Sequence, residues 1–232
     1  MKQTINRFRQ SILARPERGQ SLVELALFLP ILLIILVGVF EMGFFINHYI
    51  NMLDATREAA RYAADLDPVA NYRPEYNHNS ASYNAGFVYY CEDPDGDEKK
   101  GGGPLKGTTE FYTVVACYAE QSMPERFDPS NGYDDIVISA FTIENGAVLY
   151  RWPYDAGEMG FSYLGHQASR FSNADLSDLV SGYAPRQGFV IVEIFWQHRQ
   201  ALALPVFTVF IPERIPIHVY TIMPNPTAGT VE

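Results

Sequence analysis

The sequence predicts an α+β protein in which a long N-terminal helix crosses a membrane, continues as a stalk, and is followed by a mainly antiparallel β domain. Three observations predict this class. Residues 25–40 are apolar and carry no charge, which is typical of a membrane helix. A helix-favouring pattern then continues to about residue 65. The C-terminal half holds alternating apolar segments separated by turn signals, which are typical of strands.

The composition is that of a chain that can form a folded domain, and it argues against nucleic-acid binding. Aromatic residues make up 14% of the chain and charged residues only 19%, so there is enough apolar material for a core. The formal net charge is −10. Because contacts to phosphates need clustered Lys and Arg, we expect no nucleic-acid partner.

Residues 1–19 are predicted to form a basic cytoplasmic leader. Basic residues outnumber the single acidic residue, Glu17, and by the positive-inside rule they place the N-terminus in the cytoplasm and the residues after about 47 outside it. The basic residues are Lys2, Arg7, Arg9, Arg15 and Arg18.

Residues 20–47 are predicted to form a single transmembrane helix in contact with lipid. Apolar residues beyond Glu41 lengthen the apolar segment to about 22 residues, close to the number that an α-helix needs to span the hydrocarbon core. A cleaved secretory signal is the alternative. Its apolar run is usually shorter, about 7–15 residues, and no small-x-small cleavage site follows the run here.

Glu24 is the informative residue of this helix, because an ionisable group at the start of an apolar segment is costly and usually has a partner or a role. The surrounding sequence RGQSLVEL, residues 18–25, resembles the processing site of type IV prepilins, where a prepilin peptidase cuts after a glycine and an acidic residue is fifth in the mature chain. Cutting after Gly19 makes Gln20 the first residue and Glu24 the fifth.

Two physical interpretations of Glu24 stand beside this resemblance. Its carboxylate could pair with the new α-amino group of an adjacent subunit, or simply favour the positive end of the helix dipole. The alternative is that Glu24 reaches the membrane interface and the chain is not cut.

A longer stretch, GQSLVELALFLP at residues 19–30 together with ATREAARYA at residues 55–63, resembles the TadE-like family of tight-adherence (Flp-type) pilus systems. The resemblance covers about residues 18–65. It implies a minor pilin or pseudopilin at the cell membrane or associated with a pilus, processed by a prepilin peptidase. The implied partners are other pilin-like subunits and the pilus assembly platform, meeting in part through Glu24.

Residues 48–66 are predicted to form a helical stalk, ended by Asp67 and Pro68. A helix over residues 21–65 would be about 67 Å long at 1.5 Å per residue, enough to span the bilayer and project beyond it. Several apolar residues fall close to one face of this helix. These are Ile46, Tyr49, Ile50, Leu53, Ala60 and Ala64.

Residues 67–223 are predicted to form the extracytoplasmic β domain, and residues 224–232 a flexible tail. The strongest signal is Asn145-Gly146 between two apolar runs, which predicts a two-residue β-hairpin turn. A short helix is expected at residues 172–182, with Leu176 and Leu179 inward, and the strand at 189–198 is expected to have one buried face. The strands are expected at residues 87–91, 110–118, 136–143, 147–152, 189–198, 205–211 and 215–222.

Two features of this domain leave alternatives open. Cys91 and Cys117, outside the cytoplasm, could form a disulfide, or remain as two buried thiols, because sequence spacing does not fix the distance between them. The carboxylates of Asp93, Asp95 and Asp97 could bind calcium, but the EF-hand pattern needs Gly where Glu98 stands. We interpret this segment as an exposed loop and expect neither metal nor cofactor.

No catalytic motif is present in the sequence, and the five histidines are widely scattered. We therefore expect a protein that is not an enzyme, although folding could bring His166, His198 or His218 to a carboxylate. The competing hypothesis is an uncleaved, membrane-anchored surface domain that binds a ligand through its tyrosine-rich loops at residues 72–90. A membrane-anchored hydrolase is a third and weaker hypothesis.

Overall fold

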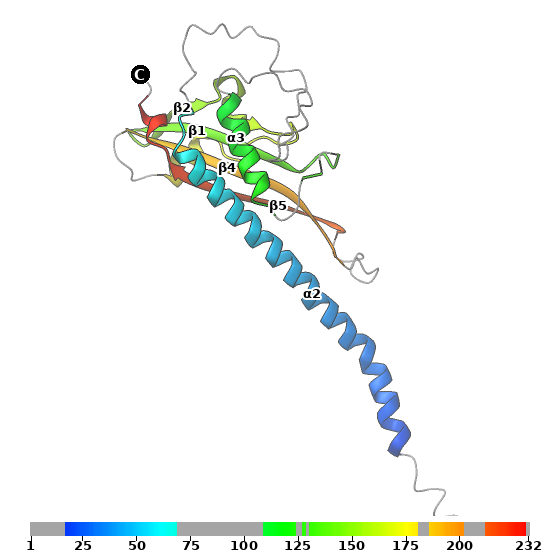
Figure 1. Ribbon diagram of the computed structural model, residues 1–232. Coiled ribbons are helices and arrows are strands. Elements are labelled where there is room, and N and C mark those ends of the chain that lie inside the picture. The colour runs from blue at the N-terminus through cyan, green and yellow to red at the C-terminus, as the bar shows by residue number, and fades with distance from the viewer. Residues whose placement is uncertain are drawn as a thin grey trace, which may run out of the picture.

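A computed structural model describes residues 17–68, 109–123, 127–128, 130–180, 186–201 and 212–230. One long helix, α2 (Glu17–Ala64), leads into a C-terminal domain built on an antiparallel sheet (Figure 1). This domain comprises the described residues from 109 to 230, and one face of the last part of α2 packs against it. The predicted α+β class, with a long N-terminal helix followed by an antiparallel sheet, is confirmed.

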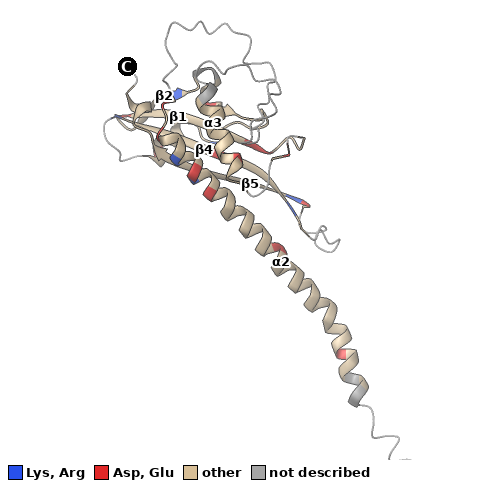
Figure 2. Ribbon diagram, viewed as in Figure 1, with Lys and Arg blue, Asp and Glu red and all other residues tan. Residues whose placement is uncertain are grey.

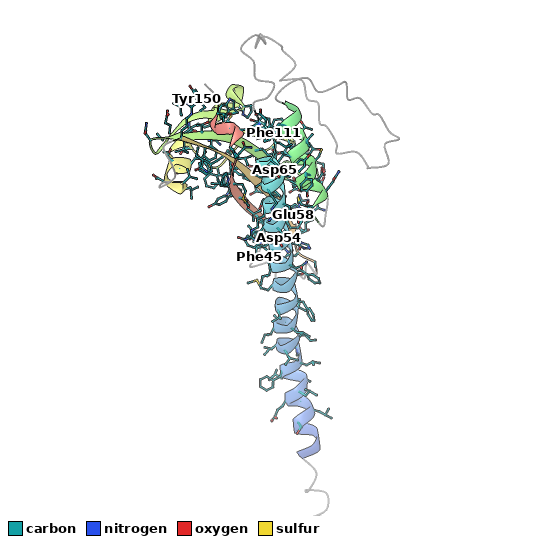
Figure 3. All side chains as sticks on the ribbon, turned by 60° about the vertical axis from the view of Figure 1, so that its left-hand side comes forward. Phe45, Asp54, Glu58, Asp65, Phe111 and Tyr150 are labelled. Carbon is teal, nitrogen blue, oxygen red and sulfur yellow. The ribbon has the colours of Figure 1, made fainter. Side chains whose placement is uncertain are left out.

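Helix α2 is continuous over 48 residues, including Pro30, and has two different halves. Up to about Phe45 most of its side chains stand away from the rest of the chain, and beyond Phe45 one face of the helix packs against the C-terminal domain (Figure 3). The buried face of this second half is formed mainly by small side chains, which let the helix approach the sheet closely. Its members are Met52, Ala55, Thr56, Ala59, Ala60 and Ala63.

The predicted stalk, residues 48–66, falls mainly in this second half of α2. One of its faces packs into the core of the C-terminal domain, whereas Ile46, Tyr49 and Ile50 are 41–49% exposed. The alanines matter on the packed face because small residues bury little area themselves but allow close packing against a sheet.

The sheet has the order β2-β1-β4-β5, with β3 paired to β1, and all its pairs are antiparallel. Helices α2 and α3 cover one face, and the segment from η1 (Tyr154–Met159) to α4 (Asn173–Leu179) contributes to covering the other. The strands are β1 (Asp135–Glu144), β2 (Ala147–Trp152), β3 (Phe161–Ser162), β4 (Arg186–Arg199) and β5 (Arg214–Pro224).

The hairpin predicted at Asn145-Gly146 joins β1 to β2. Both residues have positive φ angles, 51° and 80°, as the favoured two-residue hairpin turn requires. The predicted strands at 189–198 and 215–222 correspond to β4 and β5. The expected strands at 87–91 and 205–211 lie outside the described residues.

Residues 110–118 are not a strand: they lie in α3 (Thr109–Gln121). The aromatic and β-branched residues of this segment favoured a strand locally. Its buried positions, however, recur with helical spacing at 111, 112, 115, 116 and 119, and this face packs against the core. The ring of Tyr118 also stacks on the ring of Tyr62 of α2, with the ring centroids 4.6 Å apart. Tertiary packing therefore outweighs the local strand propensity.

Strand β4 is buried on both faces, not on one, because the segment after β2 covers the second face. Glu193, expected on a solvated face, is fully buried.

In α4, Leu176 is buried as predicted, whereas Leu179 is 47% exposed, so the prediction for Leu179 is wrong.

The C-terminal residues 225–230 are ordered, where the sequence suggested a flexible tail. Asn225 is fully buried, and its Nδ2 donates hydrogen bonds to the carbonyls of Ala63 and Leu66, each at 2.9 Å. Ala228, in the short helix η2 (Thr227–Gly229), is also fully buried. These residues close the outer end of α2, because the last carbonyls of a helix have no partner within it.

Gly188 provides a test of this closure. A Cβ at this position would lie 2.3 Å from the Asn225 carbonyl oxygen and 2.3 Å from the Gly229 nitrogen. We expect Gly188→Ala to lower the free energy of unfolding by about 1–3 kcal/mol, as overpacking typically does. Denaturation of the full chain followed by the fluorescence of buried Trp152 and Trp196 measures this. Gln187→Ala is the matched control. Equal stability of the two variants would contradict the close packing of residues 225–229 against Gly188.

Candidate functional site

The first half of α2 is an apolar cylinder with no protein around it. Its side chains from Leu22 to Leu36 are exposed on all sides, with Leu22 at 67% and Ile35 at 63%. Within the described part of the chain, Ser21–Ala64 is the one helix long and apolar enough to cross a membrane. An apolar surface this large is unfavourable in water, which indicates that lipid or other apolar helices cover it.

The predicted processing residues lie at the free end of this cylinder. Gly19 is in the first turn of α2, exposed, with no atom within 4 Å of the place a Cβ would take. Gln20 follows it in the same turn, and Glu24 is exposed one turn further on. Glu24 thus lies near the positive end of the helix dipole, which favours a carboxylate.

A second cluster joins α2 to the end of β4. The Glu41 carboxylate accepts a hydrogen bond from the Ala201 backbone N–H at 3.0 Å. His48 and His198 lie with their Nδ1 atoms 3.3 Å apart, and the ring of Phe45 packs edge-on against His198 at 5.4 Å. The sequence carries a signal for this contact, because a carboxylate at the edge of an apolar helix indicates the need for a partner.

A third cluster is buried on the face of the sheet opposite α2, around Glu193. The His218 Nε2 lies 2.9 Å from one Glu193 oxygen, and the Arg170 backbone N–H donates to the same oxygen at 3.1 Å. The Ser169 hydroxyl donates to the other oxygen. Burial lowers the pKa of Arg151, while the nearby Glu193 acts in the opposite direction by favouring the charged guanidinium.

Of the three histidines singled out in the sequence, folding brings His218 to a carboxylate side chain. His218 pairs with Glu193, whereas His198 meets His48, and the His166 ring lies 2.9 Å from the Asp134 carbonyl oxygen. His78 lies outside the described residues. The pairing of His218 follows from the register of β4 and β5, which sequence alone did not provide.

Two cavities border α2. One, about 390 Å³, lies between α2, α4 and β5, and another, about 240 Å³, lies between α2 and the end of α3. Neither is lined by Glu193 or His218. In the described ranges no three His, Cys, Asp or Glu side chains gather as metal ligands do. The geometry is thus that of a buried structural network, satisfied by hydrogen bonds.

Two predictions fall wholly or partly outside the described residues. Asp93, Asp95 and Asp97, the weak calcium candidates, lie outside them. Cys117, in α3, is disulfide-bonded, and the chain's other cysteine, Cys91, is not described. The Cys91–Cys117 pair therefore stays a prediction.

Residues 19–61 match the model of a family described as TadE-like protein. This confirms the TadE-like resemblance predicted from the sequence over the apolar helix and its continuation. No curated protein and no solved structure matches the chain. The family match indicates a membrane protein related to Tad pilus systems, with an N-terminal apolar helix.

The Glu193 cluster yields a stability prediction. Glu193→Ala removes the carboxylate that faces His218 and lies close to Arg151, so we expect a loss of about 3–5 kcal/mol in the free energy of unfolding, as when other buried pairs are broken. Denaturation of the full chain followed by tryptophan fluorescence measures it. The control Glu213→Ala removes an exposed carboxylate and should change stability little. Equal stability of both variants would show that the network contributes nothing.

Proposed function

We propose that the chain is a membrane-anchored minor pilin or pseudopilin that takes part in assembling a Tad (Flp-type) pilus or a related secretion or adhesion apparatus. A prepilin peptidase cuts it after Gly19. The apolar half of α2 then holds the mature protein in the membrane, with the N-terminus on the cytoplasmic side and the C-terminal domain outside.

The observation that carries this proposal is the form of α2 together with the family match at its start. The match begins at residue 19, the glycine after which the cut is proposed. From Ser21 to Leu36 the helix is exposed, and all of these residues except Ser21 and Glu24 are apolar. A helix that only anchored a surface domain would need the apolar band, but would have no need of a glycine and a carboxylate five residues apart at its start.

Glu24 supports assembly through helix contacts. Cleavage would create an α-amino group at Gln20, and the carboxylate of a neighbouring subunit's residue 24 would be a complementary partner for it. Near the edge of the hydrocarbon layer such a pair is less screened than in water, and therefore stronger. The apolar sides of neighbouring helices would pack together around this pair.

The proposal gives the Glu193 cluster a structural role. His218 and Glu193 do not line either of the two cavities that border α2, and Ser169 and Arg170 already donate hydrogen bonds to the carboxylate oxygens. A general acid or base must reach its substrate directly or through one water. An uncleaved, membrane-anchored binding domain remains the competing function, and the two experiments below separate it from a pilin.

N-terminal sequencing and intact mass of the protein from its native membrane test the processing. We expect the mature chain to begin at Gln20 in cells with an active prepilin peptidase, and at Met1 when the peptidase is deleted. Gly19→Val should also leave the chain beginning at Met1. Gly43→Val, at an equally exposed glycine of the same helix, should be processed normally. A start at Met1 in all cells would favour the uncleaved domain.

Glu24→Gln tests assembly. This change keeps the shape of the side chain but removes its charge, so we expect normal membrane insertion with pilus formation or surface adhesion strongly reduced. Immunoblotting of membranes and sheared surface fibres measures both. Glu58→Gln, an exposed change in the same helix beyond the apolar half, should assemble normally. Unaltered assembly in Glu24→Gln would contradict the proposed pairing.

A further inference from the structure

The geometry points to a second membrane contact: we propose that the end of the β4–β5 pair lies in the headgroup layer of the bilayer and binds phospholipid headgroups. We call this surface the β4–β5 end, and its described residues are Arg199, Gln200, Ala201, Pro212, Glu213 and Arg214. The inference rests on the proposed membrane anchoring by α2. It goes beyond that function, because anchoring by a helix does not require the C-terminal domain to touch lipid.

The first step is the depth of Glu41. From Leu22, the first exposed apolar side chain of α2, to Glu41 the helix rises about 29 Å at 1.5 Å per residue. The hydrocarbon core is about 30 Å thick. Glu41 therefore marks the outer edge of the hydrocarbon when α2 stands upright, and an average tilt of about 20° moves that edge by no more than about one turn.

The second step is the position of the β4–β5 end along the helix. The Ala201 N–H donates to Glu41, which fixes this end at the level of Glu41. Phe45 and His48 hold His198, three residues earlier, one to two turns higher on the helix. Figure 1 shows the ends of β4 and β5 beside the middle of α2, while the C-terminal end of α2 reaches the opposite end of the sheet.

The third step is the chemistry at that level. Met42, Phe44 and Ile46 are 45–59% exposed, so apolar helix surface extends up to and past Glu41. A carboxylate in such surroundings needs a donor, and the Ala201 N–H supplies one. The end of the sheet thus satisfies the one acidic residue that lies within the upper part of the apolar segment.

The polar groups of the β4–β5 end suit a headgroup layer. Arg199 has a side chain 56% exposed, and Arg214 is exposed, so both guanidinium groups can reach phosphate oxygens. Arg199 also pairs with Asp128 at 2.8 Å, and Glu213 is an exposed acid, so the surface is not simply cationic. The position of the β4–β5 end relative to the bilayer, more than its net charge, brings this surface to the lipid. Zwitterionic headgroups should therefore bind as well as anionic ones.

Depth-dependent quenching tests the proposal on the full chain, reconstituted in vesicles of phosphatidylcholine and phosphatidylglycerol with a nitroxide on some headgroups. A bimane label is placed at Glu213→Cys, or at Ala147→Cys as control, with the unsubstituted protein as the labelling blank. Ala147 follows the turn at the far end of the sheet, beside Glu144 and Arg186, and Arg186 lies 13 residues or about 43 Å along β4 from Arg199. We expect several-fold stronger quenching at 213 than at 147.

Equal quenching at 213 and 147 in inserted protein would overturn this inference and leave the anchoring intact. A chain that does not float with the vesicles would overturn the proposed anchoring itself, and this inference with it. Glu41→Ala adds a second test: it should insert normally but lose part of the quenching at 213, because the hydrogen bond from Ala201 is gone while the contacts of Phe45 and His48 with His198 remain. The matched variant Glu24→Ala, at the other end of the apolar segment, should keep it.

Discussion

The structure depends on one helix that must be stable in two different surroundings. The first half of α2 satisfies its backbone internally and presents mainly apolar side chains, which is the form a helix needs in lipid. The second half places Ala55, Ala59 and Ala63 against a sheet, where small side chains allow close contact. The C-terminal domain is therefore built around the same helix that anchors it, and cannot move independently of its own anchor.

Much of this arrangement was predictable because its signals are local in the sequence. The apolar segment, the carboxylate at Glu24 and the glycine at residue 19 are contiguous, and the same stretch carries the family match. The turn at Asn145-Gly146 was predictable because few other residues adopt positive φ angles without cost. Strands β4 and β5 followed from their alternating patterns. The candidate assembly site, which lies entirely within one helix, is local in the same sense.

The features that sequence reasoning missed all depend on contacts between distant segments. Helix α3 has the composition of a strand, and only its packing against the core explains why it is helical. The burial of Glu193 follows from a second layer over β4, and the partner of Glu41 comes from Ala201, far along the chain. Asn225 is ordered because the end of α2 offers it two carbonyls. None of these partners can be identified without the register of the sheet.

Asn225 also matters for how the molecule would carry mechanical load. It follows directly after β5 and holds the C-terminal end of α2, while Glu41 and His48 of the same helix contact the C-terminal end of β4. A pull along α2 would therefore reach the sheet at two distant points, one on each of two neighbouring strands that are bonded over eleven residue pairs. The load would be shared between both strands instead of falling on a single contact.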